Sequence, residues 1–179
     1  MAACASAVWL ASCTSAPPVN RDPATPLTTV SRVEVDRYLG EWYEIARFEN
    51  RFEEGCEGVT AAYAFNDTGS IAVTNTCRKA SMGDAPDIAK GTARIVDSTS
   101  NAKLKVSFDP FGWFEGDYWI IGLAENYEWA LVGEPSGRYL WILARTPRID
   151  AGLKAALVED LGRMGYNTGA LHWTLQPEG

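Results

Sequence analysis

Short runs rich in Val, Ile, Tyr, Trp and Thr, separated by turn residues about every ten positions, fill the chain between residues 40 and 145. This pattern is typical of an all-β sandwich or barrel. It predicts eight strands, at residues 40–48, 58–65, 70–77, 87–96, 103–108, 117–123, 127–132 and 139–145. Tight-turn sequences such as residues 66–69 (Asn-Asp-Thr-Gly) join neighbouring runs, so successive strands are expected to pair antiparallel.

The segment after the eighth strand has a different periodicity. Asp150 is a suitable helix N-cap, and Leu153, Leu157, Val158 and Leu161 recur at helical spacing before Gly165. A helix is therefore predicted there, followed by a short final strand at residues 171–175. Eight up-and-down strands can close into a barrel that encloses one small ligand. An open sandwich fits the same pattern of strands.

Composition narrows the class of partner. A chain of 179 residues is long enough for one domain with a substantial core. Its net charge of -7 and the absence of any basic cluster argue against nucleic acid as a partner, because phosphate binding needs clustered Lys and Arg. Seven Trp, seven Tyr and six Phe instead supply strand propensity and large apolar surfaces, which favours a ligand cavity.

The N-terminal segment has the features of an export signal. Residues 1–12 carry no charge, and residues 10–13 (Leu-Ala-Ser-Cys) resemble the bacterial lipobox, in which cleavage leaves Cys13 as an acylated N-terminus. Two or more acyl chains make a durable membrane anchor. The Pro-rich residues 13–30 are predicted to form a flexible tether, and residues 31–179 the folded domain. An export signal normally opens with a basic region, but no Lys or Arg lies within residues 1–12. A start further upstream and a chance match in a disordered tail therefore remain open.

Three stretches in fixed order carry a family resemblance. Residues 40–47 (G-E-W-Y-E-I-A-R) resemble the G-x-W signature of lipocalins, in the longer form of the bacterial outer-membrane group. Residues 125–127 resemble the family's T-D-Y-like turn, with Glu-Asn in place of Thr-Asp, and an arginine ends the eighth strand. The motif residues are Gly40, Trp42, Asn126, Tyr127 and Arg145. The resemblance implies a lipocalin (calycin) barrel with a hydrophobic ligand, without cofactor or metal.

Strand direction places these motifs in space. In an up-and-down barrel the start of strand one, the connection before strand seven and the end of strand eight lie at the same end, so Arg145 can reach Trp42. A guanidinium over an indole face is favourable, and we expect this contact to close that end. The opposite end, the mouth, holds the loops at residues 49–57, 109–116 and 133–138.

Two of the mouth loops carry bulky apolar residues, which are Phe52, Phe111, Trp113 and Phe114. Exposed apolar clusters usually mark a contact with ligand, membrane or partner, and a homodimer through the mouth is one such expectation. The alternative is that these rings fold inward as a lid over the pocket.

Alternation of side chains along each strand, taking Trp42 and Arg145 as inward, selects most of the pocket residues, and the mouth loops add Phe52 and Arg138. The predicted lining is Ala46, Phe52, Ala61, Tyr63, Val73, Asn75, Val106, Phe108, Tyr118, Ile120, Arg138, Tyr139 and Trp141. Tyr118, Arg138 and Tyr139 are expected near the mouth, where the arginine would pair with a carboxylate or phosphate unless it is simply solvated. The alternative for the whole set is a barrel filled by its own side chains.

Cys56 opens the second predicted strand and Cys77 closes the third, so the hairpin between them brings both to the mouth. A disulfide is predicted, as export permits. A reactive thiol at Cys56 is the alternative.

Catalysis finds little support in the sequence. His172 is the only histidine, and no metal-ligand cluster, G-x-S-x-G elbow or phosphate loop occurs. The expected function is to bind, store or transport a fatty acid or lysophospholipid, the ligands that the family resemblance implies, at the outer membrane and facing the periplasm. A catalytic lipocalin and a ligand-free structural envelope lipoprotein are the alternatives.

Overall fold

The computed structural model describes residues 16–79, 83, 85–109 and 111–177. The strands are β1 (Gly40–Phe48), β2 (Glu57–Phe65), β3 (Ile71–Arg78), β4 (Asp87–Ile95), β5 (Lys103–Ser107), β6 (Gly116–Leu123), β7 (Trp129–Gly133), β8 (Leu140–Ala144) and β9 (Leu171–Trp173). The helices are α1 (Val35–Tyr38), α2 (Ala151–Arg163) and the 3-10 turn η1 (Thr168–Ala170). The predicted strands are all present, with ends within about two residues, whereas α1 was not predicted.

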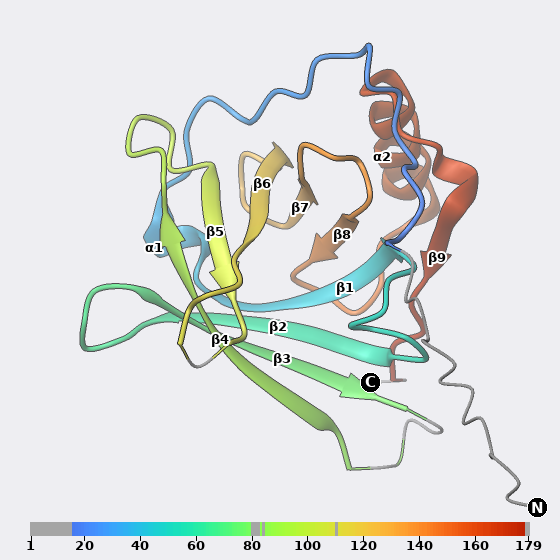
Figure 1. The fold of residues 1–179 in the computed structure, drawn as a ribbon. Coiled ribbons are helices and arrows are strands. Elements are labelled where there is room, and N and C mark those ends of the chain that lie inside the picture. Colours follow the sequence, from blue (N-terminus) through green and yellow to red (C-terminus); the bar gives the residue numbers. More distant parts are fainter. Residues whose placement is uncertain (1–15, 80–82, 84, 110, 178–179) are drawn as a thin grey trace, which may run out of the picture.

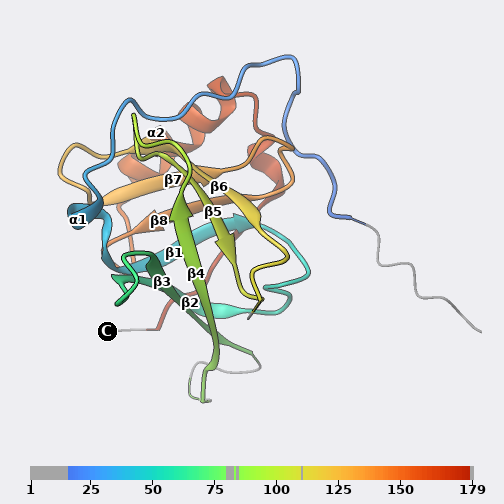
Figure 2. The ribbon, with the colours of Figure 1, turned by 60° about the vertical axis from the view of Figure 1, so that its left-hand side comes forward.

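The strands form a closed barrel with α2 on its outside (Figures 1 and 2). Each of β1 to β7 pairs antiparallel with its successor, and β8 pairs with β1. This confirms the up-and-down barrel and rules out the open sandwich. β9 adds to the second half of β1, beyond the point where the β1–β2 pairing ends. No helix in the described ranges has the length and apolar composition needed to cross a membrane.

The barrel wall separates two apolar cores. Inward side chains such as Trp42, Val73 and Ile120 form the core inside the barrel. Outward side chains of β1 and β6–β8 form a second core against Leu157 and Leu161 of α2. Helix α2 begins where predicted, because the carboxylate of its N-cap, Asp150, accepts hydrogen bonds from the first turn.

A β-bulge reverses the alternation in β1. Its pairing with β8 shifts between Glu44 and Ala46, so Ala46 lies opposite Ile142 and joins the outer core under α2. The prediction that Ala46 lines the pocket is therefore wrong. Past the bulge Arg47, opposite the inward Trp141, takes the inward face.

Residues 20–33 are bound to the barrel, in place of the solvated tether expected up to residue 30. Backbone hydrogen bonds join Asn20 N to Gly137 O (2.9 Å) and Val30 N to Ile120 O (3.0 Å). Between these contacts the segment, blue in Figure 1, passes α2 and crosses to α1. Cys13 lies outside the described residues.

Candidate ligand-binding site

Arg145 and Trp42 close one end of the barrel, as predicted. The guanidinium carbon lies 3.8 Å from the centroid of the indole, which is fully buried. The guanidinium also donates to the carbonyl oxygens of Glu41 (2.7 Å), Arg37 (2.8 Å) and Leu39 (2.9 Å). One side chain at the end of β8 thus holds the end of α1 and the start of β1, and it covers this end of the barrel.

The other motif residues support this closure. Gly40 has φ +94°, and a Cβ there would lie 3.3 Å from Arg145 Nη1, so glycine suits both the backbone and the close approach. The hydroxyl of Tyr127 accepts from Glu34 N at the start of α1 (2.8 Å). Asn126 accepts from Glu128 N within its own turn (3.3 Å). These contacts are structural.

Three tyrosines form a layer across the barrel interior above the closed end. The Tyr118 hydroxyl is hydrogen-bonded to those of Tyr38 (2.8 Å) and Tyr63 (3.0 Å). Burial raises the pKa of Tyr63 to about 12 and raises those of Tyr38 and Tyr118 well above their usual value, so all three are neutral at physiological pH. Tyr118 therefore lies within the barrel, and its prediction as a mouth residue that meets a head group is wrong.

A small apolar cavity lies between α1 and this layer. Its volume is about 20 Å³, and its lining includes four predicted pocket residues, Tyr63, Val106, Tyr118 and Ile120. A space of this size holds one water molecule and is far too small for an acyl chain. The space inside the barrel that could hold a larger molecule would therefore lie between the tyrosine layer and the mouth.

Some inward side chains of β2, β3, β5 and β8 are partly open to solvent in that half, whereas Val132 of β7 and Arg47 of β1 stay buried. Along β3, Val73 is buried and Asn75 is half-buried. Along β5, Leu104 is buried, Val106 is half-buried, and Phe108 just beyond the strand is 45% exposed. The same trend holds in β2, from Tyr63 to Ala61, and in β8, from Leu143 to Trp141 and Tyr139. Because these side chains face the barrel interior, solvent enters from the mouth.

Aromatic rings wall this open half. Tyr139 and Trp141 stack with centroids 5.9 Å apart and planes 9° apart, and Phe52 lies 6.3 Å from Tyr139. On the opposite wall the ring of Phe108 packs on Gly91, where a Cβ would lie 2.8 Å from it. Flat apolar ring surfaces therefore line this half of the barrel.

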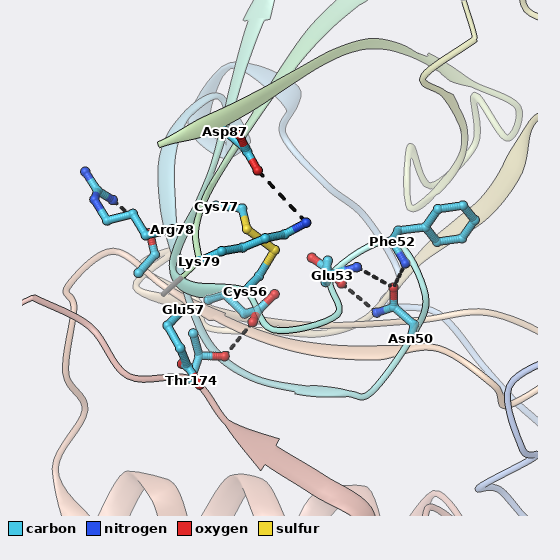
Figure 3. Close-up of a disulfide and its surroundings, with 12 residues drawn as sticks. Asn50, Phe52, Glu53, Cys56, Glu57, Cys77, Arg78, Lys79, Asp87 and Thr174 are labelled. Atoms are coloured by element: carbon cyan, nitrogen blue, oxygen red, sulfur yellow. Dashed lines mark hydrogen bonds and ion pairs between the residues drawn. A yellow bond between two sulfur atoms is a disulfide. The ribbon is translucent and has the colours of Figure 1, made fainter. Parts of the chain in front are cut away.

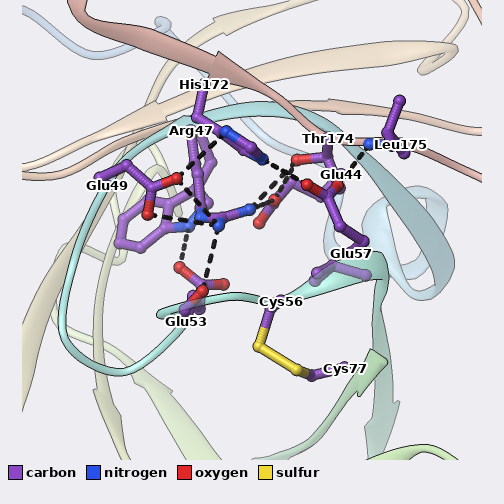
Figure 4. Close-up of polar contacts among 12 residues, drawn as sticks. Glu44, Arg47, Glu49, Glu53, Cys56, Glu57, Cys77, His172, Thr174 and Leu175 are labelled. Carbon is purple, nitrogen blue, oxygen red and sulfur yellow. Dashed lines mark hydrogen bonds and ion pairs between the residues drawn. A yellow bond between two sulfur atoms is a disulfide. The ribbon is translucent and has the colours of Figure 1, made fainter. Parts of the chain in front are cut away.

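Arg47, Glu44 and Glu53 form a polar cluster, shown in Figure 4, beside Trp141. Arg47 is fully buried and donates to Glu44 Oε1 (2.8 Å) and Glu53 O (3.0 Å), while Trp141 Nε1 donates to Glu53 Oε2 (3.0 Å). Burial raises the pKa of Glu44, and the charge of Glu53 raises it further. The hydrogen bond from Thr174 and the charge of Arg47 lower the pKa, but by less. Sequence reasoning missed Arg47 because strict alternation places it outward.

The C-terminal segment completes this cluster by filling the gap where β2 leaves β1. Gln176 Nε2 donates to the carbonyl oxygens of Glu44 (2.8 Å) and Val59 (2.9 Å). His172 lies between Glu57 (2.8 Å) and Glu49 (3.1 Å), as Figure 4 shows. The single histidine thus belongs to a polar seam between strands, and its two neighbours are carboxylates.

Arg138 does not face the pocket. Its Nη1 donates to Pro17 O (2.6 Å), in the N-terminal segment. The expected pairing with a ligand head group is therefore wrong, since a backbone carbonyl already holds this guanidinium.

Cys56 and Cys77 form the predicted disulfide, with Cα atoms 5.2 Å apart (Figure 3). The bond joins the residue before β2 to the end of β3 at the mouth, and Cys56 is not a free thiol. Among the described residues no group of three or more His, Cys, Asp or Glu side chains is arranged to hold a metal ion.

The aromatic side chains of the mouth loops are largely exposed. Phe52 is 66% exposed, Phe111 74%, Trp113 78% and Phe114 79%. Rings folded inward as a lid would be buried over the pocket. The exposure of these four rings therefore rules out the lid alternative.

Comparisons with known proteins agree with this architecture. The lipocalin-like domain family matches residues 33–176. The chain is 42% identical over 160 residues to the outer membrane lipoprotein Blc of Citrobacter freundii, covering 87% of this chain and 86% of that protein. It is 39% identical over 177 residues to the outer membrane lipoprotein Blc of Escherichia coli K12, covering 99% and 96%.

Solved structures show the same fold at low sequence identity. Insecticyanin from the tobacco hornworm Manduca sexta superposes with a TM-score of 0.66 at 14% identity, covering 86% of each chain. That similarity concerns the fold alone. With the match over most of its length and with relatives near 40% identity, the chain belongs to the lipocalin-like family.

Proposed function

We propose that this lipocalin binds a single-chain lipid, a fatty acid or lysophospholipid, in the mouth half of the barrel and stores or carries it without chemical change. The observation that carries this proposal is the rise in exposure of the inward side chains toward the mouth. An apolar space that opens at one end fits a molecule with one polar end.

The walls suggest how such a ligand lies. The acyl chain would contact Ala61, Val73 and Val106 and end above the tyrosine layer, with Phe108 and Trp141 on either side. The buried Oδ1 of Asn75 has no hydrogen-bond partner, and it shares this inward face. A ligand hydroxyl or ammonium group would satisfy it.

Paired tryptophan substitutions test the site. Ala61 faces inward and Ala62 outward on the same strand, so Ala61→Trp fills the pocket while Ala62→Trp adds the same bulk outside. Titration with a fluorescent fatty acid should show loss of binding for the first and wild-type affinity for the second. Equal binding by both variants would place the ligand elsewhere.

Two further measurements keep this test decisive. Trp141→Ala removes a wall without overfilling the barrel, and it should weaken fatty acid binding while the thermal transition stays cooperative. Mass spectrometry of lipid recovered after incubation should return it unaltered. Hydrolysed or oxidised lipid would instead indicate a catalytic lipocalin.

We also propose that the protein is anchored to the outer membrane through acylated Cys13 and faces the periplasm. Support comes from the lipobox-like residues 10–13 and from relatives named outer membrane lipoproteins. Labelled palmitate should enter the wild-type protein and not Cys13→Ser, which should move to the soluble fraction. Incorporation into both would assign the acyl chain to another residue.

A further inference from the structure

The β5–β6 loop presents three aromatic side chains to solvent at the mouth, Phe111, Trp113 and Phe114, which we name the aromatic loop. The loop is ordered by Asp109, whose carboxylate accepts from Trp113 N (2.7 Å) and whose carbonyl accepts from Gly112 N (3.0 Å). The rings of Phe111 and Trp113 lie 5.3 Å apart. A structured turn thus holds apolar rings in water, which is unfavourable unless something covers them.

The N-terminal segment begins at the same end of the barrel. Arg138 binds Pro17 O (2.6 Å) and Gly137 O accepts from Asn20 N (2.9 Å), and both contacts come from the β7–β8 loop of the mouth. Cys13 precedes Pro17 by four residues, which span at most about 14 Å when extended. An acyl group on Cys13 would therefore hold the mouth, and not the closed end, beside the bilayer.

We propose that the mouth docks onto a lipid bilayer, with the aromatic loop and Phe52 in the interface between head groups and acyl chains. Trp is enriched at this depth because its ring is apolar and its N–H is polar. The pocket then opens toward the membrane, and a lipid passes between bilayer and barrel without crossing water. For the anchored protein this inference rests on the proposed acylation of Cys13, whereas docking of the barrel itself does not.

The charge of the protein indicates what kind of bilayer surface fits. The net charge is -7, so attraction to anionic lipids does not drive the contact. Docking by aromatic rings should occur on neutral phosphatidylcholine and depend little on salt.

Vesicle binding by the full chain carrying Cys13→Ser, which lacks the acylated residue, tests the surface alone. Flotation with phosphatidylcholine vesicles should show a partition coefficient at least about tenfold lower when Phe111, Trp113 and Phe114 are all changed to Ser. Phe65, 52% exposed at the closed end, supplies the matched control, and Phe65→Ser should partition like its parent. Equal partitioning of the triple variant and its parent would overturn the proposal.

Fluorescence quenching tests the orientation of the anchored protein. In phosphatidylcholine vesicles with brominated acyl chains, the acylated wild type should lose part of its Trp emission. Trp113→Phe keeps an apolar ring and should stay bound, yet lose most of that quenching. Undiminished quenching in Trp113→Phe would mean that another tryptophan, and another face, meets the lipid.

Two outcomes distinguish membrane docking from ligand binding in the pocket and from dimer formation. The triple Ser variant should bind fluorescent fatty acid in solution like its parent, so a failure of docking is distinct from a failure of the pocket. If sedimentation shows that the parent is a dimer and the triple variant a monomer, while both bind vesicles equally, the surface serves a second copy of this chain and the bilayer proposal is wrong.

Discussion

The closed end and the mouth of the barrel are made from the same strands, but their side chains differ in burial and in hydrogen-bond partners. At the closed end Trp42 is fully buried, and Arg145 meets carbonyl oxygens and the indole face. At the mouth Trp141 and Tyr139 stay half-buried, and Asn75 Oδ1 lacks a partner. The difference indicates that the closed end contributes stability, while the mouth keeps unsatisfied surface for a ligand.

The mouth itself has two sides. Where β1, β2 and β3 reach it, the disulfide and the Arg47 cluster fix the chain, and the C-terminal segment fills the seam. On the β5–β6 side the rim carries exposed rings. A rigid side beside an apolar side suits a pocket that keeps its shape while it contacts lipid.

The largest expected effect is a loss of stability, which should differ between substitutions of two tryptophans, one at each end of the barrel. Trp42→Ala should lower the free energy of unfolding by about 3–5 kcal/mol, because it empties a buried site at the closed end. Trp141→Ala should cost less than about 2 kcal/mol, since that ring is half-buried, and should mainly weaken fatty acid binding. Urea unfolding and lipid titration of both variants measure this, and equal losses of stability would erase the distinction between the ends.

Removal of the disulfide should have the next largest effect. The double substitution of Cys56 and Cys77 by Ala releases a loop with a sequence separation of 21, and should destabilise the protein by ~3 kcal/mol through the entropy of the unfolded chain. Calorimetry of this variant, with reduced wild type as the matched sample, checks the value. A loss of only a few tenths of a kcal/mol would show that the mouth is held without the bond.

Arg145→Ala should cost about 2–3 kcal/mol, because it removes the cation-π contact and the hydrogen bonds to the exposed carbonyl of Arg37 and the partly buried carbonyl of Leu39. Arg145→Lys keeps the charge but not the planar fork, so it should recover only part of the loss. Lipid affinity of the folded variant should stay at the wild-type value. A weaker affinity at full folding would mean that the closed end also shapes the pocket.

The sequence allowed the barrel, its helix, the disulfide and the Arg145–Trp42 contact to be predicted, because each follows from periodicity and strand direction. Pocket residues were predicted less well, since alternation holds only until a bulge, and the one beside Ala46 moves that residue outward and Arg47 inward. Arg138 and Tyr118 were misplaced for another reason. Their partners, Pro17 O and the Tyr38 hydroxyl, come from segments far away in the sequence that no local pattern connects.

The last expected effect is a pH dependence of stability at the rigid side of the mouth. Because burial raises the pKa of Glu44 above its ordinary value of 4.5, the folded protein keeps this proton after the unfolded chain has lost it. Stability contributed by the protonated group is complete below pH 4.5 and is lost as pH rises toward the folded pKa, by at most about 1.4 kcal/mol per pH unit.

Glu44→Gln mimics the protonated form and still accepts from Arg47, so the stability of the variant relative to wild type should rise with pH across that window. Unfolding by urea at a series of pH values above 4.5 measures the difference, with Glu41→Gln, on an exposed residue of the same strand, as the control. A difference that falls with rising pH would mean that Arg47 keeps Glu44 ionised. The rigid side of the mouth would then contain a buried ion pair between these two side chains.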